Sequence, residues 1–292
     1  MIDVVFQCNT NAILQAQMIK GLFYWLCLVI HNLMIDISKD LENMKPSLKI
    51  DRDVASITLS RPRLANKLAA EDLPELVRHI EAVNRNTDVR VLILQSEGKH
   101  FCSGYDISDI KNSQHSGSSF GEMVDAFEQC SAVTIAALQG GVYGGATDLV
   151  LACDFRVGSQ LTNMFMPAAR LGLHFYAQGL ERYVTRLGLD TAKRLFLTCE
   201  HLQAAEMKTC GFLTHLCEPE ALQDTVDQLS NTLRTMAPIA IRGMKKHLNL
   251  IARGHHDVQA IQREVERTLH SKDLTEGGLA WKEKRTPVFT GQ

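Results

Sequence analysis

Two apolar runs, each followed by a glycine-bearing turn and then by a helix-compatible segment, occupy residues 91–154. The run at 91–94 leads to the turn at 101–106, and the run at 133–138 leads to the turn at 140–148. Short apolar runs bounded by turn signals are typical of buried strands, and strands that alternate with helices favour a parallel α/β sheet. This stretch therefore predicts two strand-to-helix turns within one α/β fold.

The backbone amides at these turns have a clear chemical consequence. The first amides of a helix have no intrahelical acceptor, and the helix dipole favours negative charge at that end. If the two turns meet in space, amides from both form an oxyanion hole, which stabilises charge that develops on a carbonyl oxygen. Loss of one such donor typically raises the barrier by about 2.7–4 kcal/mol.

The segments on both sides of this stretch favour the same architecture. Two short strands are expected before it, and Arg61-Pro62 ends the second because proline cannot continue a ladder. Helical spacing of apolar residues in the last third of the chain predicts a helical layer. The expected strands are 48–51, 54–59 and 89–95, and the expected helices include 69–85, 120–130, 221–236, 239–253 and 258–269.

Composition narrows the class of protein. With 292 residues, 45% of them hydrophobic, the chain can bury a large core. A net charge of -2 with both signs interspersed provides no basic face, so no nucleic-acid partner is expected. The 8 cysteines include no C-x-x-C pair, which indicates neither a zinc site nor a disulfide framework. A reducing cytoplasm is the expected compartment, and no metal is expected.

Residues 1–46 differ in character from the rest of the chain. The run 21–30 is strongly apolar, but it is shorter than the roughly 20 residues that a membrane helix needs, so no membrane partner is expected. Three interpretations of this extension stay open. It is a targeting or membrane segment, an extension upstream of a true start at Met34 or Met44, or a helix packed on the body.

Several pieces of the sequence, in their order and spacing, resemble one family. They are Ile57-Thr58-Leu59-Ser60-Arg61-Pro62, Phe101-Cys102-Ser103-Gly104-Tyr105-Asp106-Ile107, Gly144-Gly145-x-x-Asp148-Leu149, Ala152-Cys153-Asp154 and the tail from Ser271 to Phe289. Together they resemble the crotonase superfamily of enoyl-CoA hydratases and isomerases. The resemblance covers residues 47–292, and its specificity lies in the combination of the pieces.

The resemblance implies a fold, an assembly and a substrate. The expected fold is α/β, with a crotonase-like ββα spiral core at 47–220 and a helical C-terminal region at 221–292. The expected assembly is a homotrimer or hexamer. The expected substrate is an acyl-CoA thioester, and no cofactor is expected beyond the CoA that the substrate carries.

The resemblance also assigns residues to the site. It implies that the amides of Tyr105 and Gly145 form the oxyanion hole and stabilise the enolate of the thioester. CoA would be held largely by backbone groups of the first turn. These are the groups of Cys102, Ser103, Gly104, Asp106 and Ile107.

Asp148 stands where the family has its first catalytic carboxylate, one helical turn past the hole, and a carboxylate there can move a proton. The second family carboxylate falls on Ala168, which can neither hold nor split a water. Efficient hydration is therefore not expected, whereas isomerisation or decarboxylation needs only one acid or base. His174 and Tyr176 follow on a segment that lines the acyl pocket in the family, and either could supply a proton or orient a carboxylate.

Other features have plainer interpretations. Glu122, Asp125 and Glu128 recur at helical spacing and are expected to form a solvated face rather than a metal site. Cys102 has no obvious histidine partner and is expected to be a small buried side chain. The polar segment 107–121 is either a lid or a plain connector. The rival function is that of a non-catalytic acyl-CoA-binding or assembly protein of the same fold.

Overall fold

The structure is a computed structural model that describes residues 44–106 and 116–292. The described residues from Lys45 onward belong to one compact unit. Nearly all of the extension at 1–46 lies outside the described residues. So do residues 107–115 of the polar segment, which include Ile107. The expected division of the chain at residue 220 stays a prediction.

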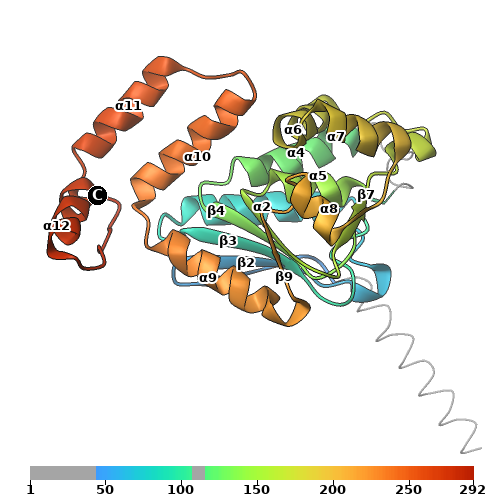
Figure 1. Cartoon of the computed structure of the whole chain (residues 1–292), viewed down its shortest axis with the longest axis horizontal. Coiled ribbons are helices and arrows are strands. Elements are labelled where there is room, and N and C mark those ends of the chain that lie inside the picture. The colour runs from blue at the N-terminus through green and yellow to red at the C-terminus, as the bar shows by residue number, and fades with distance from the viewer. Residues whose placement is uncertain (1–43, 107–115) are drawn as a thin grey trace, which may run out of the picture. The chain divides into compact units, whose positions relative to one another are not determined.

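A six-stranded sheet of order β1-β2-β3-β4-β6-β9 forms the centre of this unit (Figure 1). Only the β1–β2 pair is antiparallel, and the remaining neighbours run parallel. All residues of β4 are buried, as expected of a parallel strand that helices cover on both faces. The strands are β1 (Ser47–Asp51), β2 (Val54–Leu59), β3 (Val91–Ser96), β4 (Val133–Leu138), β6 (Phe155–Ser159) and β9 (His215–Cys217).

The two faces of the sheet contribute to two separate hydrophobic cores. Successive strand residues point to opposite faces, so Leu92 and Leu94 belong to one core while Val91 and Ile93 belong to the other. The first core is closed by three helices and the second by α9, on the opposite side of the sheet in Figure 1. The helices are α2 (Asp72–Arg85), α4 (Ser116–Glu128), α5 (Gly145–Ala152) and α9 (Leu222–Arg234).

A small three-stranded sheet, β5-β7-β8, begins within the second glycine turn. Its strands are β5 (Val142–Tyr143), β7 (Asn163–Phe165) and β8 (Leu202–Gln203). The helices around it are α6 (Ala177–Leu187), α7 (Leu189–Lys193), a π-helix (Arg194–Thr198) and α8 (Ala204–Thr209), with 3-10 turns at Pro62–Leu64, Ala168–Leu171 and Pro219–Ala221.

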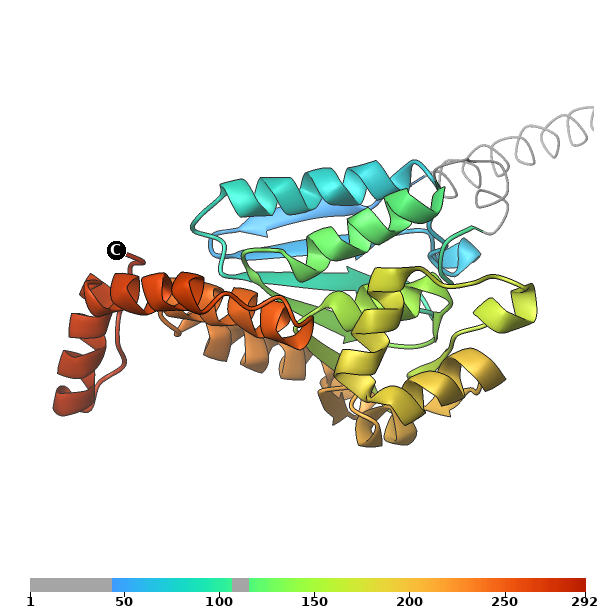
Figure 2. The same ribbon diagram turned by 90° about the horizontal axis from the view of Figure 1, so that it is seen from above.

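The last helices are α10 (Pro238–Ala252), α11 (Val258–Leu269) and α12 (Lys272–Glu283). The sequence predicted α9, α10 and α11 to within a few residues, but it did not predict α12. Figure 2 shows α11 and α12, in red, leading away from the sheet. Several of their apolar side chains are exposed, including Val258 at 70% and Trp281 at 88%. Within the described part of the chain, no helix is long and apolar enough to span a membrane.

Gly140, at the start of the second turn, tests how tightly the two turns are packed. A β-carbon added to Gly140 would lie 2.0 Å from the carbonyl oxygen of Lys99, far inside contact distance. We expect Gly140→Ala to lower the free energy of unfolding by about 1–3 kcal/mol, because backbone must move to accept the methyl group. Chemical denaturation measures this loss.

The matched control is Gly278→Ala, in the exposed interior of α12, where an added β-carbon meets nothing within 4 Å. Alanine is a better helix former than glycine, so this change is expected to raise the free energy of unfolding by up to about 1 kcal/mol. Equal effects of the two substitutions would contradict the tight packing of the turn.

Candidate functional site

The two glycine turns lie against each other. A β-carbon added to Gly104 would lie 3.1 Å from the amide nitrogen of Gly145 and 2.7 Å from the carbonyl oxygen of Tyr143. Gly104 also has a φ of +95°, which glycine adopts without the cost that a side chain would impose. Glycine at this position therefore permits both the backbone conformation and the close approach of the turns.

Backbone hydrogen bonds hold the first turn between two neighbours. On one side, the N–H of Tyr143 donates to the carbonyl of Cys102 at 2.9 Å. On the other side, the N–H of Leu68 donates to Gly104, and the N–H of Asp106 donates to Leu68, both at 2.9 Å. The first turn is thus an extended segment whose backbone is hydrogen-bonded on both sides.

The amides of Tyr105 and Gly145 both lie where the turns meet. Leu68 exchanges hydrogen bonds with the residues on either side of Tyr105, so the N–H of Tyr105 points away from Leu68. Gly145 is the first residue of α5, and its N–H has no acceptor within the helix. The preceding amide, of Gly144, donates to the carbonyl of Phe165 at 3.0 Å.

Aromatic side chains cover the region around these amides. A β-carbon added to Gly145 would lie 2.7 Å from Cζ of Phe120, so this ring rests on the glycine. The ring centroid of Phe120 lies 5.7 Å from that of Tyr105 and 6.1 Å from that of Tyr176. The ring centroids of Phe175 and Tyr176 are 4.6 Å apart. An acyl group bound near the two amides would therefore contact aromatic rings.

Asp148 lies in the first turn of α5 and is fully buried. Its Oδ2 accepts hydrogen bonds from the hydroxyl of Tyr176 and from Nη1 of Arg182, the latter at 2.7 Å. Its Oδ1 is also buried and has no hydrogen-bond partner among the described residues. One oxygen of this carboxylate is therefore held in place while the other can accept a further donor.

The surroundings of Asp148 suit proton transfer. Burial raises the pKa of Asp148, and Arg182 together with the Tyr176 hydroxyl limits that rise. The pKa of Tyr176 is raised as well, by burial and by the adjacent carboxylate, so its hydroxyl stays protonated and donates. A carboxylate whose pKa moves toward neutrality can both take up and release a proton.

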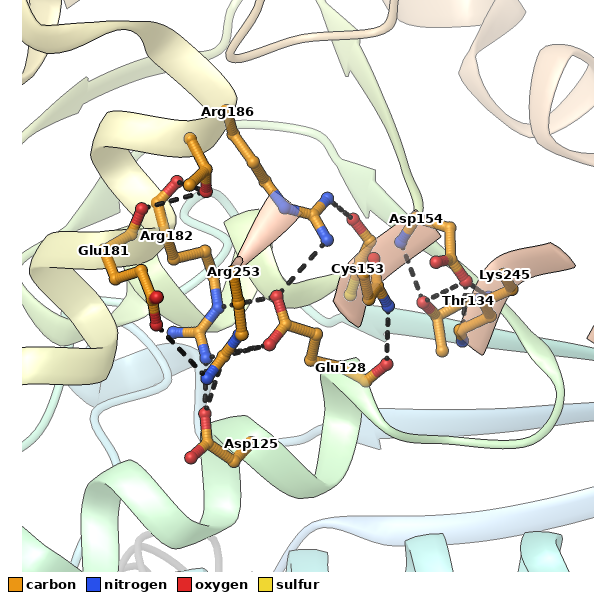
Figure 3. A network of polar contacts seen from close by, with 12 residues as sticks. Asp125, Glu128, Thr134, Cys153, Asp154, Glu181, Arg182, Arg186, Lys245 and Arg253 are labelled. Carbon is orange, nitrogen blue, oxygen red and sulfur yellow. Dashed lines mark hydrogen bonds and ion pairs between the residues drawn. The ribbon is translucent and has the colours of Figure 1, made fainter. Parts of the chain in front are cut away.

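Arg182 is a site residue that the sequence analysis missed. Its guanidinium is fully buried and binds three carboxylates, those of Asp125 at 2.6 Å, Glu128 at 3.2 Å and Asp148 at 2.7 Å. Figure 3 shows the contacts with Asp125 and Glu128. Burial opposes the charge of Arg182, but Asp148 and Glu128 raise its pKa above the usual value. This guanidinium is the main counter-charge of the site.

The expectation that Asp125 and Glu128 form a solvated face was therefore wrong. Glu128 is only 5% exposed, and both carboxylates pair with arginines from other helices because α6 and α10 cover this side of α4. Nothing in the sequence distinguished these two residues from Glu122, since all three recur at helical spacing. Glu122, on the same helix, is exposed as expected.

The other expected site residues have different surroundings. His174 is exposed, and its Nδ1 hydrogen-bonds the carbonyl of Phe175 at 2.7 Å, so Tyr176 rather than His174 contacts Asp148. Ala168 is buried at the start of its 3-10 turn. Cys102 is fully buried, its thiol donates to Asn66 at 3.0 Å, and burial raises its pKa to about 12, which confirms the expected structural role.

At the first turn, Asp106 forms an ion pair with Lys67, and Ser103 donates its N–H to the carbonyl of Ala65 at 2.8 Å. The residues expected to hold CoA thus lie on a backbone that hydrogen bonds fix in place, apart from Ile107, which lies outside the described residues. No group of three or more His, Cys, Asp or Glu side chains within 44–106 and 116–292 is arranged to hold a metal ion.

Glu128 provides a test of the buried ionic cluster. Burial would raise the pKa of Glu128, but Arg182 and Arg253 hold it below the ordinary value of 4.5. Ionised Glu128 therefore stabilises the fold above pH 4.5, and this contribution is lost as the pH falls through the lowered pKa. We expect Glu128→Gln to lower the free energy of unfolding at pH 7 by about 3 kcal/mol.

Urea unfolding of both proteins at pH 7 and at pH values below 4.5 measures this difference, which should shrink as the pH falls. The control is Glu122→Gln on the exposed side of α4, for which a change within about 0.5 kcal/mol is expected. A Glu128→Gln loss that does not vary with pH would contradict the ionic contribution.

Comparison with known proteins gives consistent matches. Residues 49–292 match the model of the enoyl-CoA hydratase/isomerase family. The enoyl-CoA isomerase/hydratase fer4 of Mycosarcoma maydis is 30% identical over 257 residues, or 84% of this chain and 92% of that protein. Methylmalonyl-CoA decarboxylase of Escherichia coli K12 is 26% identical over 82% of this chain and 95% of that protein. A crystal structure of enoyl-CoA hydratase from Bacillus anthracis matches with a TM-score of 0.79 and 29% identity, over 85% of this chain and 100% of that one.

Proposed function

Because this chain belongs to the enoyl-CoA hydratase/isomerase family, we propose that it acts at C2 and C3 of an acyl-CoA thioester through an enolate intermediate. The match to a solved hydratase confirms the expected crotonase-like α/β fold. The family accounts for the class of substrate. The choice of reaction and of residues rests on the site itself.

In this proposal the thioester oxygen accepts hydrogen bonds from the amides of Tyr105 and Gly145. Asp148 removes a proton from C2 of a 3-enoyl thioester, or from C4, the carbon beyond the double bond, of a 2-enoyl thioester, and the electrons of the broken C–H bond enter the enolate. Return of the proton at another carbon completes an isomerisation. The two amides stabilise the charge on the oxygen more strongly in the enolate than in the substrate, which lowers the barrier.

The observation that carries the proposal is that only one of the two carboxylate oxygens of Asp148 has hydrogen-bond partners among the described residues. Its Oδ2 is held by Tyr176 and Arg182, whereas its buried Oδ1 has no partner among the described residues. Asp148 follows Gly145 by one helical turn, about 4.5 Å along the axis of α5. A base and an oxyanion donor that close together can act on neighbouring atoms of one substrate.

Ala168 bears on the choice between the reactions of the family. By the resemblance it falls where the second carboxylate is expected, and it presents only a buried methyl group there. With one carboxylate, isomerisation or decarboxylation is favoured over hydration. The similarity to both an isomerase/hydratase and a decarboxylase supports this range of chemistry.

We further propose that the chain assembles as a homotrimer or hexamer, as expected from the family. The exposed apolar side chains of α11 and α12 support this, because large apolar patches on a surface mark interaction sites. Val258 is 70%, Leu269 60% and Trp281 88% exposed. CoA would lie along the backbone of the first turn, as its only cofactor.

A second candidate function is that of a non-catalytic acyl-CoA-binding or assembly protein. The observation in its favour is that Asp148 is fully buried and paired with Arg182, an arrangement that also occurs in purely structural ion pairs. Together with Ala168, it fits a fold that has lost one catalytic carboxylate and kept the other as support. Activity measurements distinguish the two functions.

The first test is turnover of a panel of 3-enoyl-CoA, 2-enoyl-CoA and malonyl-type CoA esters. We expect turnover of at least one ester, and we expect Asp148→Asn to lower its kcat/KM by about 10²–10⁴ because the general base is lost. The control is Asp190→Asn, an exposed aspartate at the start of α7, which should leave turnover unchanged. Tight CoA-ester binding without turnover of any ester would favour the second function.

The second test restores the missing acid. Ala168→Glu places a carboxylate at the second position, and we expect hydration of a 2-enoyl-CoA to rise by about tenfold or more over the wild type. Ala168→Gln, of the same length but without an ionisable group, is the matched control and should show no gain. Equal rates for the two variants would contradict the argument that one missing carboxylate limits hydration.

A further inference from the structure

A chain of ion pairs links the end of helix α10 to Asp148. Figure 3 shows its first part, from Arg253 through Asp125 and Glu128 to Arg182. Arg253 directly follows the last residue of α10. Its Nη2 contacts Glu128 and lies 3.2 Å from Asp125. The same two carboxylates bind Arg182, and Nη1 of Arg182 lies 2.7 Å from Oδ2 of Asp148. This series of ion pairs thus connects the end of α10, through α4 and α6, to α5.

Asp125 and Glu128 on α4 are each shared between the two arginines. Oδ1 of Asp125 faces Nη2 of Arg182 at 2.6 Å and Nη2 of Arg253 at 3.2 Å. Glu128 directs Oε1 to Nε of Arg182 at 3.2 Å and Oε2 to Arg253. Asp125 and Glu128 are three residues apart and therefore share one side of α4.

The sharing affects where Arg182 sits. A planar guanidinium has donors in a fixed fork, so carboxylates on α4 and Asp148 on α5 together set its orientation. Arg253 neutralises part of the charge of the α4 carboxylates. Without Arg253, these carboxylates would attract Arg182 more strongly and weaken its contact with Asp148.

Helix α10 is well placed for this role because it is anchored beside the cluster. Nδ2 of Asn249 donates to the carbonyl of Glu128 at 3.1 Å, and Nζ of Lys245 lies 2.7 Å from Asp154. Glu128 and Arg253 both line a cavity of about 950 Å³ between α10, α11 and the body. The Arg253 side chain is 17% exposed, whereas that of Arg182 is fully buried.

We propose that Arg253 is a positioning residue for Asp148, acting through Asp125, Glu128 and Arg182. The end of α10 thereby supports the proton-transfer group without touching the substrate. This inference rests on the proposed function for its catalytic meaning, but the ionic chain itself can be tested without any turnover.

The charged and titratable groups around Asp148 determine in which direction its pKa changes when the Arg182 contact weakens. Arg182 and Tyr183 come from α6, Tyr176 precedes α6, and Glu128 comes from α4. Arg182 is the only cation in this set, and it opposes the rise that burial causes in the pKa of Asp148. Weakening its contact therefore raises that pKa, so that the carboxylate form needs a higher pH.

The test follows the carboxyl carbon of Asp148 by ¹³C NMR of protein labelled at aspartate, with Asp148→Asn to assign the signal. In Arg253→Met, the titration midpoint should rise by about half a pH unit or more, whereas Arg253→Lys, which keeps a charge, should lie between the variant and the wild type. Arg263→Met, an exposed arginine on α11, is the control for a distant loss of charge and should leave the midpoint unchanged.

A second variant, expected to shift the midpoint in the opposite direction, keeps the test decisive if Arg253→Met does not fold. Asp125→Asn removes a competitor for Arg182 and should lower the midpoint of Asp148. Thermal unfolding and size measurements confirm that each titrated variant retains the native state. An unchanged midpoint in folded Arg253→Met, or in Asp125→Asn where the first does not fold, overturns the proposal.

Kinetics separate this inference from the proposed function. If the wild type turns over an acyl-CoA, the acid limb of its kcat/KM profile should move with the NMR midpoint in Arg253→Met, with little change in KM. Shifted midpoints in a protein without turnover would support the ionic chain and overturn the catalytic role of Asp148. Turnover with unshifted midpoints would overturn the role of Arg253 and leave the catalytic role of Asp148 standing.

Discussion

The buried charge of Asp148 is the constraint on which the rest of the site depends. An unpaired carboxylate in a protein interior is very costly, so a fully buried aspartate needs a counter-charge. Arg182 supplies it, and because Arg182 is itself buried it requires Asp125 and Glu128 in turn. One charge on α5 thereby links α4, α5 and α6 through ion pairs. Removal of Arg182 would leave the buried carboxylate of Asp148 without the cation that pairs with it.

The sheet explains why this charge lies beside the two turns. Strands β3 and β4 are parallel neighbours, so the segments that follow them leave the sheet at the same edge. Gly104 in the first segment and Gly145 in the second are therefore brought into contact, and α5 starts at that contact. Its first turn carries Asp148. A strand pairing, a close glycine contact and a helix start thus bring an oxyanion donor and a base together.

Much of this arrangement could be predicted from the sequence, because it depends on local signals. Apolar runs and glycines marked β3, β4 and both turns, and the spacing of Gly145 and Asp148 is a property of one short segment. Arg182 could not be predicted in the same way, because it lies 57 residues from Asp125 and 34 from Asp148. The same holds for the choice of Tyr176 over His174, which depends on how the segment before α6 turns.

The sequence by itself determined β1 to β4, the turns, most of the helices and the family, since periodicity, glycine positions and the order of motifs are all written along the chain. Tertiary structure decided which charged groups meet. Asp125 and Arg253 are 128 residues apart, and their contact exists only because α10 packs beside α4. An acidic residue at helical spacing looks the same in a sequence whether it faces water or an arginine, because burial and pairing depend on the neighbouring helices.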